Sequence, residues 1–163
     1  MLVVGDRGTV LRSSDGESFA AQTIAGASDL RDVSLDSSGR LALAVDTAGN
    51  VWASRDAGSS FVKEYTSAHA LYGVSVNHPG TWALAVGELG GALLREPIGR
   101  WTALDTHADA TLEAALVAHD GSRFYAAGAS GTLLRSPDRG TSWTHVALGT
   151  TANLHALEDL DPH

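Results

Sequence analysis

The sequence predicts an all-β fold assembled from repeated units of about 41 residues, each holding four short strands. The first observation is a Gly-x-x-Gly turn, replaced by Asp-x-x-Gly in the second unit, whose last position is glycine at Gly8, Gly49, Gly90 and Gly131, each 41 residues after the last. The second is a turn motif, Ser-x-Asp-x-Gly-x-Ser-aromatic, which is complete at 54–61 and 136–143. The third is that no segment sustains a helical stripe of period 3.6. A unit of about 41 residues suits four strands joined by three tight turns, which is one blade of a β-propeller.

The strands of one blade can be followed in the second unit. Residues 30–35 alternate apolar and polar, and residues 40–45 are nearly continuously apolar, as in a strand covered on both faces. Residues 50–54 follow a glycine turn, and residues 60–65 alternate again. Because Gly, Asp, Asn and Ser separate these runs, we expect antiparallel hairpins within each blade.

The Ser-x-Asp motif has the chemistry of a structural turn. Its Ser and Asp side chains can accept hydrogen bonds from backbone N–H groups of their own turn, and its glycine supplies a positive φ. The closing aromatic ring can fill the gap between two blades. A third copy is one residue shorter, and a fourth, at 95–101, has lost the Ser and Asp but keeps Trp101. The structural residues are therefore predicted to be Ser13, Asp15, Gly16, Phe19, Ser54, Asp56, Gly58, Phe61, Ser136, Asp138, Gly140 and Trp143.

These copies resemble the Asp-box (BNR) repeat. Together with the preceding Ala-Val-Gly-x-x-Gly, as at 85–90, the unit looks most like the photosystem II stability/assembly factor-like propellers, over nearly the whole chain. The resemblance implies a propeller, a periplasmic or extracellular location and an assembly role with a partner protein. Asp boxes occur in sialidases, sorting receptors and assembly factors alike, so function must be argued from a site.

The two ends of the chain are expected to share one blade. Residues 1–4 match 42–45, the second strand of a unit, and residues 154–160 stand where a first strand belongs. The predicted blades are approximately 28–67, 69–108, 109–152, and a split blade of 153–163 with 1–27, making four per chain. A single chain could close as a four-bladed ring, and two chains exchanging end strands could close as an eight-bladed homodimer. The chain could also be a piece of a longer propeller.

Composition excludes some partners and leaves others open. The net charge is −8 with no basic stripe, which argues against nucleic acid. Cysteine is absent, so no disulfide is expected. No apolar run reaches about 18 residues, so no membrane span is expected, and no signal-peptide pattern precedes the first blade.

Four equivalent positions on the expected inner strands carry different polar side chains: Arg31, Tyr72, Glu113 and His155. Their neighbours repeat while these positions diverge, which is typical of a site grafted onto a regular scaffold. Drift of solvated residues is the simpler alternative. We take these four as ligand-binding candidates, with Asp6, Arg7 and Glu88 on the Gly-x-x-Gly turns of the same face. Asp46 is expected on that polar face as well.

Catalysis and metal binding have weaker support in the sequence. A sialidase-like hydrolase would need an arginine cluster, a Tyr–Glu pair and an acid. Tyr72 and Glu113 stand on adjacent blades, but Arg12, Arg95 and Arg135 look like scaffold residues with their heads in water. The seven histidines show no short ligand spacing. We therefore expect a non-catalytic protein-interaction scaffold without metal or cofactor. Glycan binding or hydrolysis, and an excised or engineered half-propeller that mainly self-assembles, remain alternatives.

Overall fold

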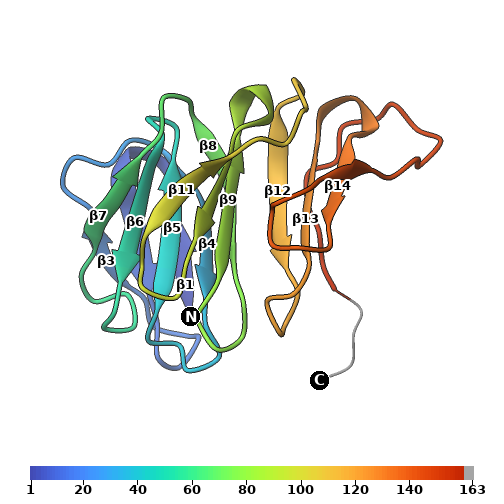
Figure 1. The fold of residues 1–163 in the computed structure, drawn as a ribbon. Coiled ribbons are helices and arrows are strands. Elements are labelled where there is room, and N and C mark those ends of the chain that lie inside the picture. Colours follow the sequence, from blue (N-terminus) through green and yellow to red (C-terminus); the bar gives the residue numbers. More distant parts are fainter. Residues whose placement is uncertain (160–163) are drawn as a thin grey trace.

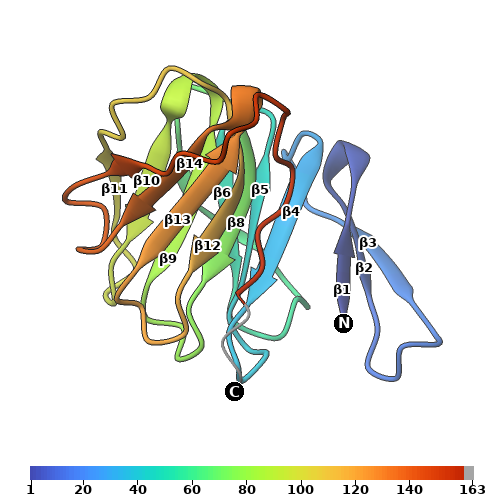
Figure 2. The same cartoon turned by 90° about the vertical axis from the view of Figure 1, so that its right-hand side faces the viewer.

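The computed structural model describes residues 1–159, which form a fan of four antiparallel sheets (Figures 1 and 2). The first sheet has three strands and the other three sheets have four. Their order within each sheet follows the chain. The strands are β1 (Leu2–Val4), β2 (Thr9–Arg12), β3 (Ala20–Thr23), β4 (Leu30–Leu35), β5 (Ala42–Asp46), β6 (Asn50–Ser54), β7 (Val62–Thr66), β8 (Leu71–Val76), β9 (Ala83–Gly87), β10 (Ala92–Arg95), β11 (Trp101–Leu104), β12 (Leu112–Val117), β13 (Phe124–Gly128), β14 (Leu133–Ser136) and β15 (Thr144–His145).

The first strands of the last three sheets, β4, β8 and β12, lie side by side along the inner edge of the fan. Polar side chains on one inner strand accept backbone N–H groups of the next. Asp32 accepts from Val74 at 2.8 Å, and Ser75 accepts from Val117 at 3.0 Å. Adjacent sheets are therefore joined at the inner edge by hydrogen bonds as well as by packing.

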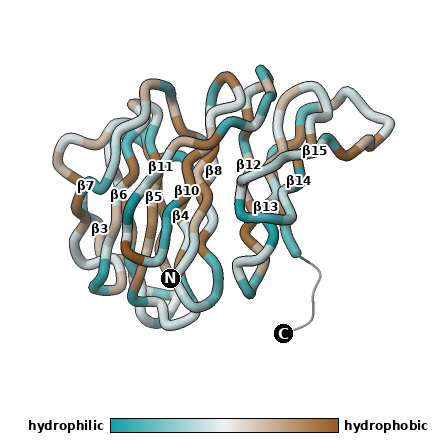
Figure 3. The backbone as a smooth tube through the Cα atoms, viewed as in Figure 1, coloured by the Kyte–Doolittle hydropathy of each residue, from teal (hydrophilic) through white to brown (hydrophobic). Residues whose placement is uncertain are grey.

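The apolar core lies between the sheets and has no single centre. β5 and β9 are buried at every position, which confirms that the continuous apolar runs form strands covered on both faces. Figure 3 shows the hydrophobic stretches mainly along strands, with hydrophilic residues at many turns. Phe61, Trp101 and Trp143 each pack into the layer between their own sheet and the preceding one, as expected of the closing aromatic.

The repeated second glycine of the Gly-x-x-Gly turn is required by both conformation and space. Gly49 has a φ of 81° and Gly90 a φ of 67°, in the left-handed region that other residues avoid. A Cβ on Gly90 would lie 1.8 Å from the carbonyl oxygen of Ala108, and one on Gly49 would lie 2.5 Å from that of His69. The 41-residue period therefore marks points where the link to the next sheet crosses close over a turn.

The complete Ser-x-Asp hairpins close on themselves. Ser54 Oγ accepts the Gly58 N–H at 2.8 Å and donates to Asp56 at 2.7 Å. Asp56 also accepts the backbone N–H of Ser60 at 2.9 Å and its hydroxyl at 2.6 Å. The hairpin at 136–142 repeats these bonds through Ser136 and Asp138, and the shorter one uses Ser13 and Asp15. The three motifs therefore act as turn-closing devices in this structure.

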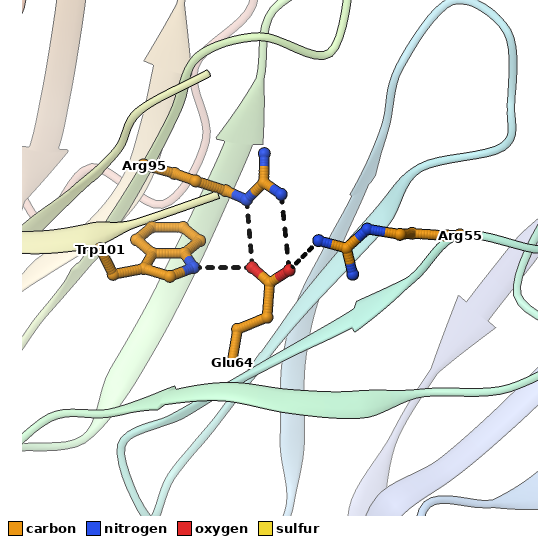
Figure 4. A network of polar contacts seen from close by, with 4 residues as sticks. All are labelled: Arg55, Glu64, Arg95 and Trp101. Atoms are coloured by element: carbon orange, nitrogen blue, oxygen red, sulfur yellow. Dashed lines mark hydrogen bonds and ion pairs between the residues drawn. The ribbon is translucent and has the colours of Figure 1, made fainter. Parts of the chain in front are cut away.

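The degenerate hairpin at 95–101 is held from outside by residues of the preceding sheet (Figure 4). Glu64, on β7, accepts hydrogen bonds from Arg95 Nε at 3.1 Å and from Trp101 Nε1 at 2.9 Å. Arg55 reaches the same carboxylate at 2.5 Å. The expectation that Arg95 holds its head in water is wrong: only 5% of its side chain is exposed. The pairing of strands explains this, because Arg95 aligns with Ser54 and Ser136, while Arg12 and Arg135 lie one position earlier.

The sheet expected from both chain ends has only its three N-terminal strands in place. In the part of the chain that the structure describes, β1 pairs with β2 alone. Residues 153–159 form no strand, but they lie against the last sheet, where Leu154 N–H donates to the Gly128 carbonyl at 3.0 Å. This bond matches the one from Leu30 N–H to Gly5 O at 3.1 Å, so the segment occupies a first-strand position. Residue 160 of the expected strand and residues 161–163 lie outside the described residues. Among residues 1–159, no helix has the length and hydropathy needed to cross a membrane.

Candidate functional site

A cavity of about 600 Å³ opens along the inner strands of the fan. Arg31, Tyr72, Glu113 and His155, which the sequence places at equivalent positions of successive units, all line it. Asp32 and Thr111 add polar atoms, and Ala114, Ala115, Ala156 and Leu157 complete the wall. The repeat therefore brings together one divergent side chain from each unit.

β-Bulges present three of these side chains. The pairing of β4 with β5 passes from Leu30 directly to Asp32, so Arg31 is the unpaired extra residue. Tyr72 is skipped in the same way between β8 and β9, and Glu113 between β12 and β13. A bulge releases one residue from the ladder and redirects its side chain, and bulges recur beside functional sites. The scaffold thus leaves one position per sheet free of any pairing role, and these are the positions that diverge.

Two side-chain pairs arrange the polar groups of the cavity. Tyr72 donates its hydroxyl to Glu88 at 3.0 Å, and burial together with that carboxylate raises the pKa of Tyr72 above its ordinary value. The second pair joins His155 Nδ1 to a Glu113 carboxylate oxygen. A hydrolase reading would need Tyr72 beside Glu113, but these residues have separate partners. Arg31 is the only arginine lining the cavity, so there is no arginine cluster among its described residues.

Asp32 is a cavity residue that the sequence reasoning missed. Its two carboxylate oxygens accept the N–H groups of Val74 and Val33, each at 2.8 Å, while burial raises the pKa of Asp32 above its ordinary value. The signal was present in the repeat. The equivalent residues are Gly73, Ala114 and Ala156, so a single carboxylate stands in a row of small residues.

The cavity has an excess of negative charge. Asp32 and Glu113 line it, Glu88 binds its tyrosine, and Arg31 is the only lysine or arginine among the described residues that line it. Three carboxylates against one guanidinium favour a ligand that carries positive charge or several hydrogen-bond donors.

Three other residues expected at this face lie elsewhere. Asp6 and Arg7 are exposed on the short turn after β1 and do not line the cavity. Asp46 is fully buried, which corrects the expectation of a surface residue. Burial opposes its ionisation, but hydrogen bonds from Asn50, Trp52 and backbone N–H groups outweigh this and lower the pKa of Asp46. Asp46 therefore closes its own turn and is not available to a ligand.

Comparison with known proteins identifies the fold of this chain but does not identify its family. No protein-family model matches the chain, and no curated protein matches it in sequence. Among solved structures it is similar to U3-55K, with a TM-score of 0.80 and 11% identity over 94% of this chain and 50% of that one. The WD40 repeats of RRP9 give a TM-score of 0.80 and 11% identity over 94% and 49%. YCF48 bound to D1 peptide gives a TM-score of 0.69 and 17% identity over 86% of this chain and 46% of that one. These likenesses confirm a β-propeller fold, and the chain spans about half the length of each of these structures.

Proposed function

We propose that this chain is a non-catalytic interaction scaffold that holds a segment of a partner protein in the cavity along its inner strands. The observation that carries the proposal is the convergence of Arg31, Tyr72, Glu113 and His155 from successive units on one open cavity. Three of them stand at bulges, where they are free of the ladder. Rigid sheets that present side chains from several strands suit the binding of an extended segment. Because the sheets are already ordered, little binding free energy is spent on reorganising the scaffold.

The charge of the cavity indicates the chemistry of the segment. Asp32, Glu88 and Glu113 outnumber Arg31, and the whole chain carries a net charge of −8. A segment with one or two lysine or arginine side chains would match this field. YCF48, which is similar in fold, was solved bound to D1 peptide, and this supports peptide binding by a propeller of this shape.

The proposal can be tested by measuring the affinities of fluorescently labelled peptides by fluorescence anisotropy. We expect a Lys/Ala peptide to bind more tightly than a Glu/Ala peptide of equal length, and the difference to shrink as salt rises. Glu113→Gln should weaken Lys/Ala binding about tenfold, close to what the loss of one hydrogen bond to a charged group costs. The matched control is Glu17→Gln, an exposed glutamate of a hairpin away from the cavity. Equal affinity for both peptides, or an unchanged affinity of the Glu113 variant, would overturn the proposal.

Glycan binding is the second ligand class for the same cavity, because Tyr72 offers it an aromatic ring and Asp32 and Glu113 offer acceptors. Titration with neutral oligosaccharides under the same conditions separates the two classes. Saturable binding of a sugar without Lys/Ala binding would favour the glycan.

We also propose that the chain belongs with the Asp-box propellers of the photosystem II stability/assembly factor-like type. The hydrogen bonds within the hairpins at 54–60 and 136–142 support the motif, and the likeness to YCF48, which was solved bound to D1 peptide, supports a peptide partner. On this reading the bound segment belongs to a protein undergoing assembly, and export to the periplasm or the extracellular space follows from the same resemblance.

We further propose that the chain acts as a homodimer that completes its ring. The supporting observation is that β1 has a free edge while residues 153–159 occupy a first-strand position without a strand partner among the described residues. Light scattering after size exclusion should give twice the chain mass of 16.9 kDa. A mass of one chain at micromolar concentration would contradict this part of the proposal.

A further inference from the structure

We infer that the two chains of this homodimer meet through a specific pair of end surfaces, and that each chain supplies the inner strand of the other's first sheet. The inference rests on the proposed dimer and assigns its interface. Its basis is the repeat itself: each end of the fan presents one half of a contact that the interior of the same molecule already shows complete.

The N-terminal end surface is formed by Met1, Val3, Leu11 and Phe19. Val3 and Leu11 are cross-strand partners on the face of the first sheet that points away from the second, because Leu2, Val4 and Val10 pack toward the second sheet. Met1, Val3 and Phe19 are 65%, 43% and 41% exposed. Large apolar side chains gathered on one face of a sheet mark a surface that packs against something.

The interior equivalents of these four residues are buried. Adding two periods of 41 gives Ala83, Ala85, Leu93 and Trp101, whose exposed fractions are 0%, 0%, 4% and 6%. They pack against Leu43, Val45 and Val51 of the preceding sheet in one apolar cluster. The N-terminal end surface therefore has the residues of a blade-to-blade contact, and no sheet packs on it among residues 1–159.

The C-terminal end surface supplies the other half of that contact. The residues of the last sheet equivalent to Leu43, Val45 and Val51 are Tyr125, Ala127 and Leu133. Tyr125 and Leu133 are partly exposed, while Ala127 is already buried. The last sheet thus offers to a following blade the same type of surface that the second sheet offers to the third.

The segment 153–159 fixes the register of the contact. In the third sheet, β8 pairs with β9 through Leu71↔Gly87, Val74↔Ala85 and Val76↔Ala83. His155 lies beside Glu113, 42 residues earlier, just as Asp32 binds Val74, so the segment continues the row of inner strands. Translating the β8–β9 register to the ends gives Leu154 opposite Gly5, Leu157 opposite Val3 and Asp159 opposite Met1. The partner's β1 would in this way gain the inner strand that its sheet lacks.

Two copies are the number that the structural comparison supports. The chain superposes on U3-55K with a TM-score of 0.80 and covers 50% of that chain, so two copies placed end to end would span the length of that structure. Joining unlike end surfaces gives a ring when the rotation closes and an open filament when it does not. Two half-rings joined head to tail at both ends close without a free sheet edge.

A charge on the end surface tests the contact. Val3→Asp should convert the dimer into a monomer, because the interface would have to bury an unpaired carboxylate. The control is Val62→Asp, since Val62 is 66% exposed on β7 of an interior sheet and should leave the dimer intact. A dimer that survives Val3→Asp would overturn the assigned surface while leaving dimerisation itself standing.

A disulfide tests the register without relying on a destabilised variant. The chain has no cysteine, so Val3→Cys with Leu157→Cys introduces a single pair. Residues directly opposite in an antiparallel ladder have Cα atoms about 4.5–5.5 Å apart, within the span of a disulfide. We expect a covalent dimer on non-reducing gels, whereas Ser18→Cys with Leu157→Cys should stay uncrosslinked.

The other outcomes distinguish a wrong strand register from the absence of a dimer. A wild-type dimer without cross-linking would overturn the register alone, and a monomeric wild type would remove the dimer and this inference together. A cross-link within a monomer would mean that one chain closes its own ring. A ladder of covalent polymers would mean that the rotation does not close at two copies.

Discussion

Two hairpins at equivalent places in adjacent sheets, residues 54–60 and 95–101, are stabilised in opposite ways. In the first, Ser54 and Asp56 bind the backbone of their own turn. In the second, Arg95 takes the place of that serine and Pro97 the place of the aspartate, so the side-chain hydrogen bonds of the motif are lost, while backbone bonds from Glu96 N–H to Arg100 O and from Gly99 N–H to Glu96 O remain. Glu64 of the preceding sheet holds Arg95 and Trp101 instead.

The difference shows how a repeat can exchange a local device for a long-range one. Closing a turn with its own side chains requires few residues to be ordered, and it works before neighbouring sheets are packed. The Glu64 network forms only when the two sheets meet, so it links the hairpin to the interface between them. Burial opposes ionisation of Glu64, but the hydrogen bonds from Arg95 and Trp101 outweigh it and keep the pKa of Glu64 below its ordinary value.

The largest expected effect comes from breaking the long-range hairpin. Glu64→Ala leaves the Arg95 guanidinium buried without its partner, and we expect a loss of about 3–5 kcal/mol in the free energy of unfolding. Urea denaturation followed by tryptophan fluorescence measures it. A loss below about 1 kcal/mol would show that Arg95 finds another partner or water.

A smaller effect is expected from the local hairpin. Ser54→Ala removes the acceptor of the buried Gly58 N–H, and we expect a loss of about 1–3 kcal/mol. Ser14→Ala, at an exposed position next to the equivalent Ser13, is the control and should change stability by less than about 0.5 kcal/mol. If Ser54→Ala costs as much as Glu64→Ala, the contrast between the two hairpins does not hold.

Acid should weaken the local hairpins through their aspartates. Backbone and side-chain hydrogen bonds lower the pKa of Asp15 and of Asp56 from 3.8 to about 2. A lowered folded-state pKa stabilises the fold above the unfolded value, and the contribution is lost as pH falls from about 4 through about 2. Asp56→Asn should therefore reduce the slope of stability against pH in this range, measured by thermal unfolding at each pH. An unchanged slope would remove Asp56 as a source of the acid sensitivity.

The smallest effect is expected at the rim of the Glu64 network. The Arg55 side chain is 61% exposed, and we expect Arg55→Ala to cost less than about 1 kcal/mol. Its effect should shrink in 1 M salt, whereas that of Glu64→Ala should persist. A loss as large as that of Glu64→Ala would mean that Arg55 is needed to hold the carboxylate.

The elements that the sequence predicted well are those that depend on nearby residues. The Gly-x-x-Gly turns, the apolar second strands and the Ser-x-Asp hairpins each carry their cause within about ten residues. Their fixed spacing then indicated the β-propeller, which the structural likenesses confirm. The sequence also singled out Arg31, Tyr72, Glu113 and His155, because a repeat makes its own exceptions visible. All four line the cavity, and their role in binding stays a prediction.

What the sequence concealed depends on contacts between distant units. The bulges at Arg31, Tyr72 and Glu113 emerge only when each inner strand pairs with its neighbour. Arg95 was misjudged because its partner, Glu64, lies 31 residues away on the preceding sheet.

The sequence by itself determined the unit of this protein, and the tertiary structure decided how the units are used. Turn chemistry and strand alternation act within one blade, so they can be read along the chain. The excess of carboxylates in the cavity and the hydrogen bonds to Glu64 arise where blades meet, and the two end surfaces lie where the first and last described sheets face outward. These depend on which side chains converge in space, because burial and electrostatic energies are set by the surroundings of a residue and not by its neighbours in sequence.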